Sequence, residues 1–168
     1  MTFGQPAWID TIIGRMGDRL VAQVGLAADL VFVYEGDPTD LCDKPPGNRF
    51  LVMAPMRADV DQGTVIGGGK SHTVLPSMFR VDAMQLVGGN REFHSYRTFR
   101  DGSGLSATVR SVINALQLYT LPNADATSTP LVEPMRLVGF EFNPRRPASG
   151  WSWCRTVWSV KFRSNIGA

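Results

Sequence analysis

Residues 102–119 constrain the fold most, because they show the periodicity of an amphipathic helix. Ser103 offers a hydroxyl for the first turn, and hydroxyl side chains are favoured as helix caps. The apolar residues that follow recur at spacings of three and four, as on one face of a helix: Leu105, Val109, Val112, Ile113, Leu116 and Tyr119. Since such a face must be covered, the sequence predicts a sheet beneath this helix.

Candidate strands lie on both sides of this helix. They are rich in β-branched and aromatic residues or alternate between apolar and polar residues, and they are bounded by turn residues. Three precede the helix and two follow it: residues 30–34, 50–54, 78–87, 136–142 and 151–162. We expect the last two to pair as a hairpin across residues 143–150.

The two faces of the last strand carry different residues, because successive side chains point to opposite sides. We expect one face to lie against the central helix; it carries Cys154, Thr156, Trp158, Val160 and Phe162. Trp151 and Trp153 cannot share that face, so we expect another subunit to bury one side of this strand.

A second helix is predicted near the start of the chain. Pro6 suits a first helical turn, and Gly25 is the expected end. The apolar residues again fit one face: Ile9, Ile12, Ile13, Met16, Leu20 and Val24. Gly14 and Gly17 each cost a helix interior about 1 kcal/mol relative to alanine, so we expect packing against a neighbouring element to hold this helix.

Two segments read as loops. Residues 39–48 show no periodicity, and Pro55 is expected to end the second strand. Residues 56–76 contain four glycines and only scattered apolar residues, and loops longer than about 12–15 residues are usually functional or disordered. This segment is either an arm that orders against a partner subunit or a surface loop without a role.

The order of elements predicts an α+β domain. A chain of 168 residues that is 43% hydrophobic fits one domain spanning residues 1–168. Because strands and helices do not alternate, we expect a mainly antiparallel β-sheet with two α-helices packed on it.

The composition narrows the classes of function. The chain is weakly basic, with a net charge of +2 and a pI of about 8.7. A dedicated nucleic-acid-binding domain usually has a pI above about 9, so we expect no primary contact with DNA or RNA. Cys42 and Cys154 are too few for a zinc site; we expect free thiols, with one disulfide left open. The sequence shows neither a leader nor an 18-residue apolar run, so we expect a soluble protein made in the cytoplasm, with no membrane contact.

No motif predicts catalysis. Gly69-Lys70-Ser71 matches the end of a phosphate-binding loop, but the required earlier glycine is displaced by one residue and Pro76 stands where a helix should begin. His72 and His94 lack the spaced partners that a metal site or a hydrolase triad needs, and we expect both on surface loops. The sequence therefore predicts no enzyme, no cofactor and no metal.

The layout of the chain resembles the tail terminator (tail completion) proteins of long-tailed bacteriophages. The matching features are the early helix, the strand at residues 78–87, the polar segment 88–104, the central helix and a closing strand that ends Val160-Lys161-Phe162-Arg163. The resemblance covers residues 8–163. The longer segment 56–76 and the wide C-terminal hairpin depart from the family.

This resemblance implies a structural protein of the virion. Family members form a hexameric ring that caps the tail tube and docks onto the neck, so the implied partners are other copies of the chain, the tail tube protein and a neck or head-completion protein. It implies no sequence-specific nucleic-acid contact, the ring leaving room for DNA to pass. Another neck protein, or a small enzyme or ligand-binding domain, stays open as an alternative.

A ring subunit needs residues for contacts between subunits. Charged and aromatic residues on expected loops and edges are the candidates: Arg57, Lys70, Arg91, Arg97, Arg100, Arg145, Arg146, Trp151 and Trp153. Arg80 is a further candidate for a salt bridge to a neighbouring subunit.

Overall fold

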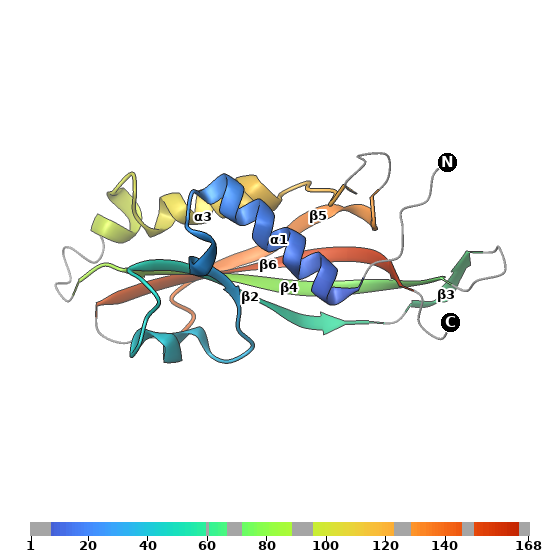
Figure 1. The fold of residues 1–168 in the computed structure, drawn as a ribbon, viewed down its shortest axis with the longest axis horizontal. Coiled ribbons are helices and arrows are strands. Elements are labelled where there is room, and N and C mark those ends of the chain that lie inside the picture. The colour runs from blue at the N-terminus through green and yellow to red at the C-terminus, as the bar shows by residue number, and fades with distance from the viewer. Residues whose placement is uncertain are drawn as a thin grey trace.

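The structure, a computed structural model, describes residues 8–59, 61–66, 72–88, 96–122, 129–145 and 150–164. Two helices pack on one face of a mostly antiparallel sheet, which confirms the predicted α+β class (Figure 1). The main elements in chain order are α1 (Ile9–Val24), β1 (Val31–Val33), β2 (Arg49–Ala58), β3 (Asp61–Ile66), β4 (His72–Leu86), α3 (Leu105–Leu116), β5 (Leu131–Phe142) and β6 (Trp151–Ser164). Three short turns are η1 (Ala28–Leu30), η2 (Pro38–Cys42) and η3 (Tyr96–Arg100), the last of them π-helical.

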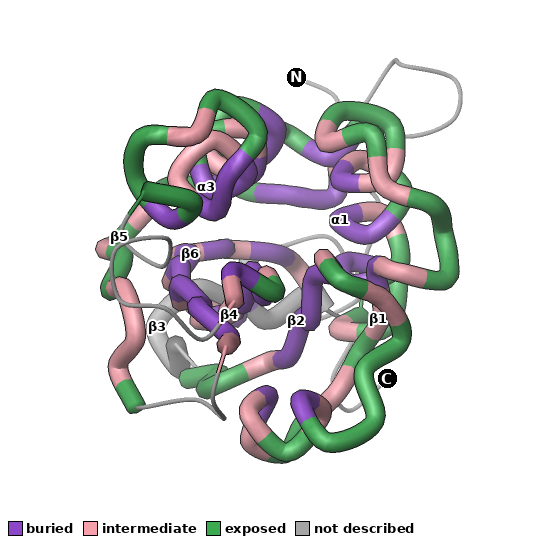
Figure 2. The backbone as a smooth tube through the Cα atoms, turned by 90° about the vertical axis from the view of Figure 1, so that its left-hand side faces the viewer, coloured by how far each residue is buried: buried purple, intermediate pink, exposed green. Residues whose placement is uncertain are grey.

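The sheet has the strand order β1-β2-β4-β6-β5, and β3 pairs with β4 off this path. Only the β1–β2 pair is parallel among the strand pairs of the described residues. The predicted C-terminal hairpin is confirmed, because β5 pairs antiparallel with β6. β1 and β5 therefore form the two outer edges, and they lie on opposite sides of the sheet in Figure 2.

Helix α1 confirms that a helix ends at Gly25; it begins at Ile9, and Pro6, expected in its first turn, lies outside the described residues. The φ of Gly25 is 75°, which is left-handed and suits glycine. A β-carbon at Gly17 would lie 3.1 Å from Cε of Met53 on β2, so this glycine lets the helix approach the sheet. Gly14 has nothing within 4 Å of such a carbon, and no contact explains it.

The start of α3 differs from the prediction. The cap residue is Gly104 and makes no side-chain cap hydrogen bond, so Ser103 is not the cap. Instead, the Ser103 amide and hydroxyl donate to Oδ1 of Asp101 at 2.9 and 2.8 Å. A β-carbon at Gly104 would lie 2.0 Å from the carbonyl oxygen of Arg97. Any side chain at this position would therefore force η3 and α3 to shift apart.

The main core lies between the two helices and the sheet. Ile12, Met16, Leu105 and Leu116 from the helices are fully buried in it with Trp158. The predicted helix-facing side of β6 is confirmed, because Cys154, Trp158, Val160 and Phe162 all belong to this core. Thr156 is buried there as well; its hydroxyl donates to the carbonyl of Val81 at 3.0 Å and accepts from Nε1 of Trp158 at 2.8 Å.

A second, smaller core lies on the opposite face of the sheet. The segment between β1 and β2, which includes η2, covers this face and appears below the sheet in Figure 2. The buried residues of this core are Cys42, Phe50, Val52, Met84, Trp151 and Trp153. Cys42 and Cys154 lie in different cores and are not joined by a disulfide, as expected.

The predictions of loops at residues 39–48 and 56–76 were wrong in part. Residues 39–48 begin inside the short turn η2. Residues 56–76 are mostly strand, because β2 continues past Pro55 to Ala58, β3 follows, and β4 begins at His72. β3 and the start of β4 project beyond the helices as an arm (Figure 1). Residues 67–71, with the consecutive glycines and Lys70, lie outside the described residues.

Candidate assembly surface

The edge strand β5 exposes apolar side chains. Within the described residues its only strand neighbour is β6. Val138 is 56% exposed and Phe140 is 54% exposed. Large apolar side chains gathered on an open sheet edge are a common mark of a protein interface.

Neighbouring elements extend this apolar edge. The ring of Phe99, on η3, packs edge-on against Phe142 with 5.1 Å between ring centroids, and Phe140 packs on Phe142 at 6.1 Å. Leu118 follows α3 and is 60% exposed beside β5. We call Phe99, Leu118, Val138 and Phe140 the β5 edge surface.

Part of the outer side of β5 is already hydrogen-bonded within the chain. The amide of Leu118 donates to the carbonyl of Met135, and the amide of Met135 donates to the carbonyl of Tyr119, both at 2.9 Å. The amide of Leu137 donates to Oε1 of Gln117 at 2.9 Å. Residues 117–119 therefore cover β5 at residues 135–137, while residues 138–142 have no second strand beside them among the described elements.

Basic residues surround the β5 edge surface. Arg97 and Arg100 are exposed on η3 and Arg136 is exposed on β5, whereas Glu141 is the exposed acid of this strand. Arg100 and Arg136 form no ion pair with another described residue. The balance of charge at this edge is therefore positive.

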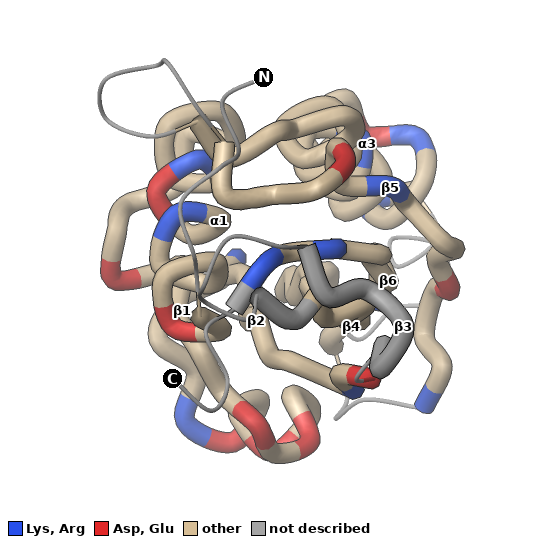
Figure 3. The backbone as a smooth tube through the Cα atoms, turned by 90° about the vertical axis from the view of Figure 1, so that its right-hand side faces the viewer, with Lys and Arg blue, Asp and Glu red and all other residues tan. Residues whose placement is uncertain are grey.

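The opposite edge, at β1, is acidic. Val33 is 49% exposed on β1, and the exposed acids Asp29 and Glu35 stand before and after the strand. Asp40 and Asp43 are exposed farther along the segment between β1 and β2, where Lys44 is the exposed base. Figure 3 shows the charged residues of both edges, with β1 and β5 on opposite sides.

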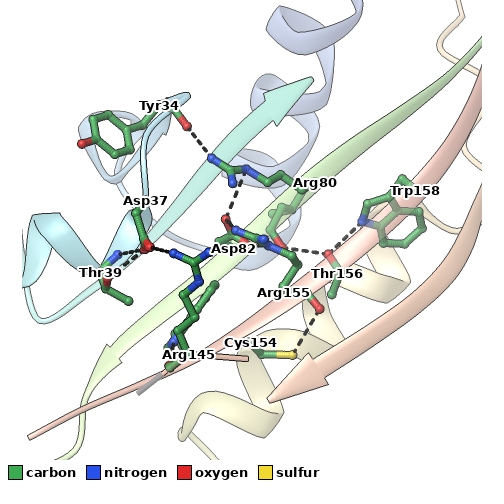
Figure 4. A network of polar contacts seen from close by, with 12 residues as sticks. Tyr34, Asp37, Thr39, Arg80, Asp82, Arg145, Cys154, Arg155, Thr156 and Trp158 are labelled. Atoms are coloured by element: carbon green, nitrogen blue, oxygen red, sulfur yellow. Dashed lines mark hydrogen bonds and ion pairs between the residues drawn. The ribbon is translucent and has the colours of Figure 1, made fainter. Parts of the chain in front are cut away.

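A buried ionic network lies on the central strands β4 and β6, against the chain that follows β1 (Figure 4). Arg155 donates from Nε and Nη2 to the fully buried carboxylate of Asp82 at 2.8 and 3.1 Å. Nε of Arg80 lies 3.5 Å from the same carboxylate, and Nη2 of Arg80 donates to the carbonyls of Tyr34 and Gly36 at 3.2 and 2.7 Å. The network thus ties the chain after β1 to β4 and β6.

Burial and pairing shift the pKa values in this network. Burial raises the pKa of Asp82, and the hydrogen bond and charge of Arg155 oppose that rise. The hydrogen bond to Asp82 raises the pKa of Arg155. The hydroxyl of Thr39, which donates to Asp37 at 2.8 Å, lowers the pKa of Asp37, and Nη1 of Arg145 pairs with that carboxylate at 2.9 Å.

A polar cavity of about 320 Å³ adjoins this network and is lined by Arg80, Arg145, Arg155, Glu35, Asp37 and Trp153. Each of its three arginines already pairs with an acid of the same chain. Such internally matched charges hold the segment after β1 on the sheet and leave little net charge to attract a ligand.

The predicted contact residues are scattered over the structure. Arg57 is exposed but pairs with Asp59 at 2.8 Å. Arg97 and Arg100 lie together on η3, where Nη1 of Arg97 donates to the carbonyl of Val87 at 3.3 Å. Arg145 pairs with Asp37. Lys70, Arg91, Arg146 and His94 lie outside the described residues.

Three candidates for intersubunit contacts are engaged inside the chain. Trp151 and Trp153 are buried in the second core, because β6 is a central strand and the segment after β1 covers that face. Their expected burial by another subunit is therefore wrong. Arg80 likewise pairs with Asp82 and is not free to bridge to a neighbour. His72, expected on a loop, is the first residue of β4.

The sequence contained signals for two features that the prediction missed. In β5 the apolar residues change from odd positions, such as Met135 and Leu137, to the even positions Val138 and Phe140. This change of phase indicates a bulge, and the register of β5 against β6 shifts between Leu137 and Gly139. Across the bulge Leu137, opposite Trp158, and Phe140, opposite Thr156, stay on the helix-facing side of the sheet. The ionic network was signalled by Asp82 and Arg155, which place opposite charges inside two predicted strands.

The described residues contain no cluster of three or more His, Cys, Asp or Glu side chains that could bind a metal. In the same part of the chain, no helix is both long and apolar enough to span a lipid bilayer.

Comparison with known proteins found similarity at the level of structure and not of sequence. No protein-family model and no curated protein matches the sequence. Among solved structures, the chain is similar to one described as "Virion of native gene transfer agent (GTA) particle", with 11% sequence identity and a TM-score of 0.48. The likeness covers 91% of this chain and 95% of the other, but at this level it assigns no function.

Proposed function

We propose that this chain is a structural protein of a long-tailed phage virion. In this proposal it forms a hexameric ring at the head-proximal end of the tail, caps the tail tube and joins it to the neck. The partners are other copies of the chain, the tail tube protein and a neck or head-completion protein. The role needs no catalytic group or cofactor.

The observation that supports this proposal most is the β5 edge surface. A monomer normally protects a long sheet edge with charges, prolines or a covering element. Here residues 117–119 cover only part of β5, and Val138, Phe140 and Phe99 stay exposed beside the rest. A surface of this kind suits repeated contacts between subunits, and the layout of the sequence resembles that of tail terminators.

The length of tails tests the proposed position. Deleting the gene should leave tail tubes uncapped, so electron micrographs of lysates should show tubes longer than normal that fail to join heads. Normal tails that remain separate from heads would instead favour another neck protein. Tails of normal length joined to heads would reject both roles.

Phe140→Asp tests whether the exposed edge takes part. We expect the variant to fold but to complement the deletion poorly, because the new charge would be buried in the contact. Met56→Asp is the matched control, since Met56 is also an exposed apolar residue, 49% exposed, but lies on β2. Equal complementation by the two variants would remove the β5 edge surface from assembly.

A further inference from the structure

We infer that the β5 edge of one copy docks onto the β1 edge of the next copy, head to tail. The inference deepens the proposed function and depends on its premise that copies of the chain form a ring. In this contact the sheet of one subunit continues into the sheet of the next.

The two edges offer matching backbone and apolar groups. β1 has β2 as its only strand neighbour and β5 has β6, among the described residues. Val33 is exposed on β1, and Val138 and Phe140 are exposed on the open part of β5. Strand pairing would satisfy backbone groups of both edges while these side chains leave water.

Charge selects this pairing over the alternatives. Arg100 and Arg136 at the β5 edge have no ion-pair partner in the described part of the chain, and neither do Asp29 and Glu35 at the β1 edge. Docking β5 on β1 sets these opposite charges against each other. A β5–β5 dimer would oppose arginines, and a β1–β1 dimer would oppose carboxylates. Unlike surfaces that meet head to tail generate a closed ring when the rotation between subunits closes.

Cross-linking between engineered cysteines tests the pairing. The variant Val33→Cys with Val138→Cys carries one thiol on each edge, about 19 Å apart across four strand spacings. A bifunctional thiol reagent shorter than this span cannot join them within one chain. The native Cys42 and Cys154 are buried, so the wild-type chain serves as the unlinked control.

We expect the double variant to give a ladder of covalent oligomers that ends at the closed ring. Each single variant should stay at the size of one chain. Dimers from Val138→Cys alone would show a β5–β5 contact and overturn the inference. The inference would also be overturned if no ladder formed in purified protein at about 1 mM, a concentration at which even weak association is populated, and none formed in phage particles.

Charge exchange supplies a second test. Arg136→Glu should weaken association by about tenfold or more, because it opposes Asp29 and Glu35 with a like charge. Adding Asp29→Lys and Glu35→Lys to the same chain should restore the ladder. Arg57→Glu, at an exposed arginine on β2, is the control and should leave association unchanged. Failure of the combined variant to recover would overturn the pairing.

The two proposals can fail separately. If the double-cysteine variant gives a ladder but the gene deletion leaves tails normal, the head-to-tail contact is supported and the tail role is rejected. Defective tails without a ladder would keep the tail role and reject the contact.

Discussion

Asp82 and Arg155 join the central strands β4 and β6 by two hydrogen bonds of 2.8 and 3.1 Å, although the Asp82 side chain is fully buried. Arg80 approaches the same carboxylate at 3.5 Å and holds the carbonyls of Tyr34 and Gly36. A single carboxylate thus binds two arginines on the central strands, and Arg80 in turn holds the chain that follows β1.

Removing this carboxylate should be costly. We expect Asp82→Ala to lower the free energy of unfolding by about 3–5 kcal/mol, because it leaves the charges of Arg80 and Arg155 uncompensated. Urea denaturation measures this change. Glu133→Ala is the control, since its ion pair with Lys161 is more than one-third exposed and should contribute only about 0–1 kcal/mol. Equal losses of unfolding free energy in the two variants would show that the buried network stabilises the fold no more than an exposed ion pair does.

Two glycines should respond to alanine in opposite ways. Gly104→Ala places a β-carbon 2.0 Å from the carbonyl oxygen of Arg97, and forcing atoms into a packed site typically costs about 1–3 kcal/mol. Gly14→Ala meets nothing within 4 Å on helix α1 and should raise stability by about 0.5–1 kcal/mol. Thermal unfolding compares the two variants. A stable Gly104→Ala protein would mean that η3 lies farther from α3.

Two leucines near the end of α3 should differ although they are two residues apart. Leu116 is fully buried in the main core, so Leu116→Ala should cost about 2–5 kcal/mol of stability. Leu118 is 60% exposed, and Leu118→Ala should change the stability of the isolated chain by at most about 0.5 kcal/mol. A loss below about 1 kcal/mol for Leu116→Ala would place this helix face elsewhere.

The thiol of Cys154 should be inert in the folded protein. Burial raises its pKa to about 12, so at pH 8 almost none is thiolate, the reactive form. A thiol reagent at pH 8 should therefore modify Cys154 only after denaturation, as followed by mass spectrometry of a Cys42→Ser variant. Rapid modification without denaturant would show that the main core opens readily around β6.

The helices were predictable because periodicity acts locally, as does the glycine that ends α1. Helix α3 has no such glycine and ends at Leu116, before the predicted end at Tyr119. The strands were less so, because three prolines lie inside them. Pro55 stands where the β2–β4 register shifts, Pro134 lies on the edge strand β5, and Pro76 lies where the neighbour of β4 changes from β2 to β3. At bulges, edges and gaps a strand tolerates a residue that donates no hydrogen bond. Those places depend on partner strands, which a local pattern does not specify.

The contact surface was harder still to predict. Arginines and tryptophans were reasonable candidates by residue type, yet Arg145, Trp151 and Trp153 interact within the chain. Whether such a residue is available depends on which segment covers it, and the cover over Trp153 comes from residues more than one hundred positions earlier. The exposed apolar residues of β5 could have been placed only with the bulge, and its position depends on how β5 pairs with β6.

The hydrogen bonds from residues 117–119 to β5 have a consequence for fidelity. They occupy the outer edge of β5 at Met135 and Leu137. A neighbouring strand that moved along β5 toward these residues would therefore collide with Leu118 and Tyr119. Slippage by one position would also turn its side chains to the wrong face. In the proposed head-to-tail contact, residues 117–119 would limit how far a neighbouring strand can slide along β5, and this limit would fix its register and oppose open-ended stacking of sheet edges.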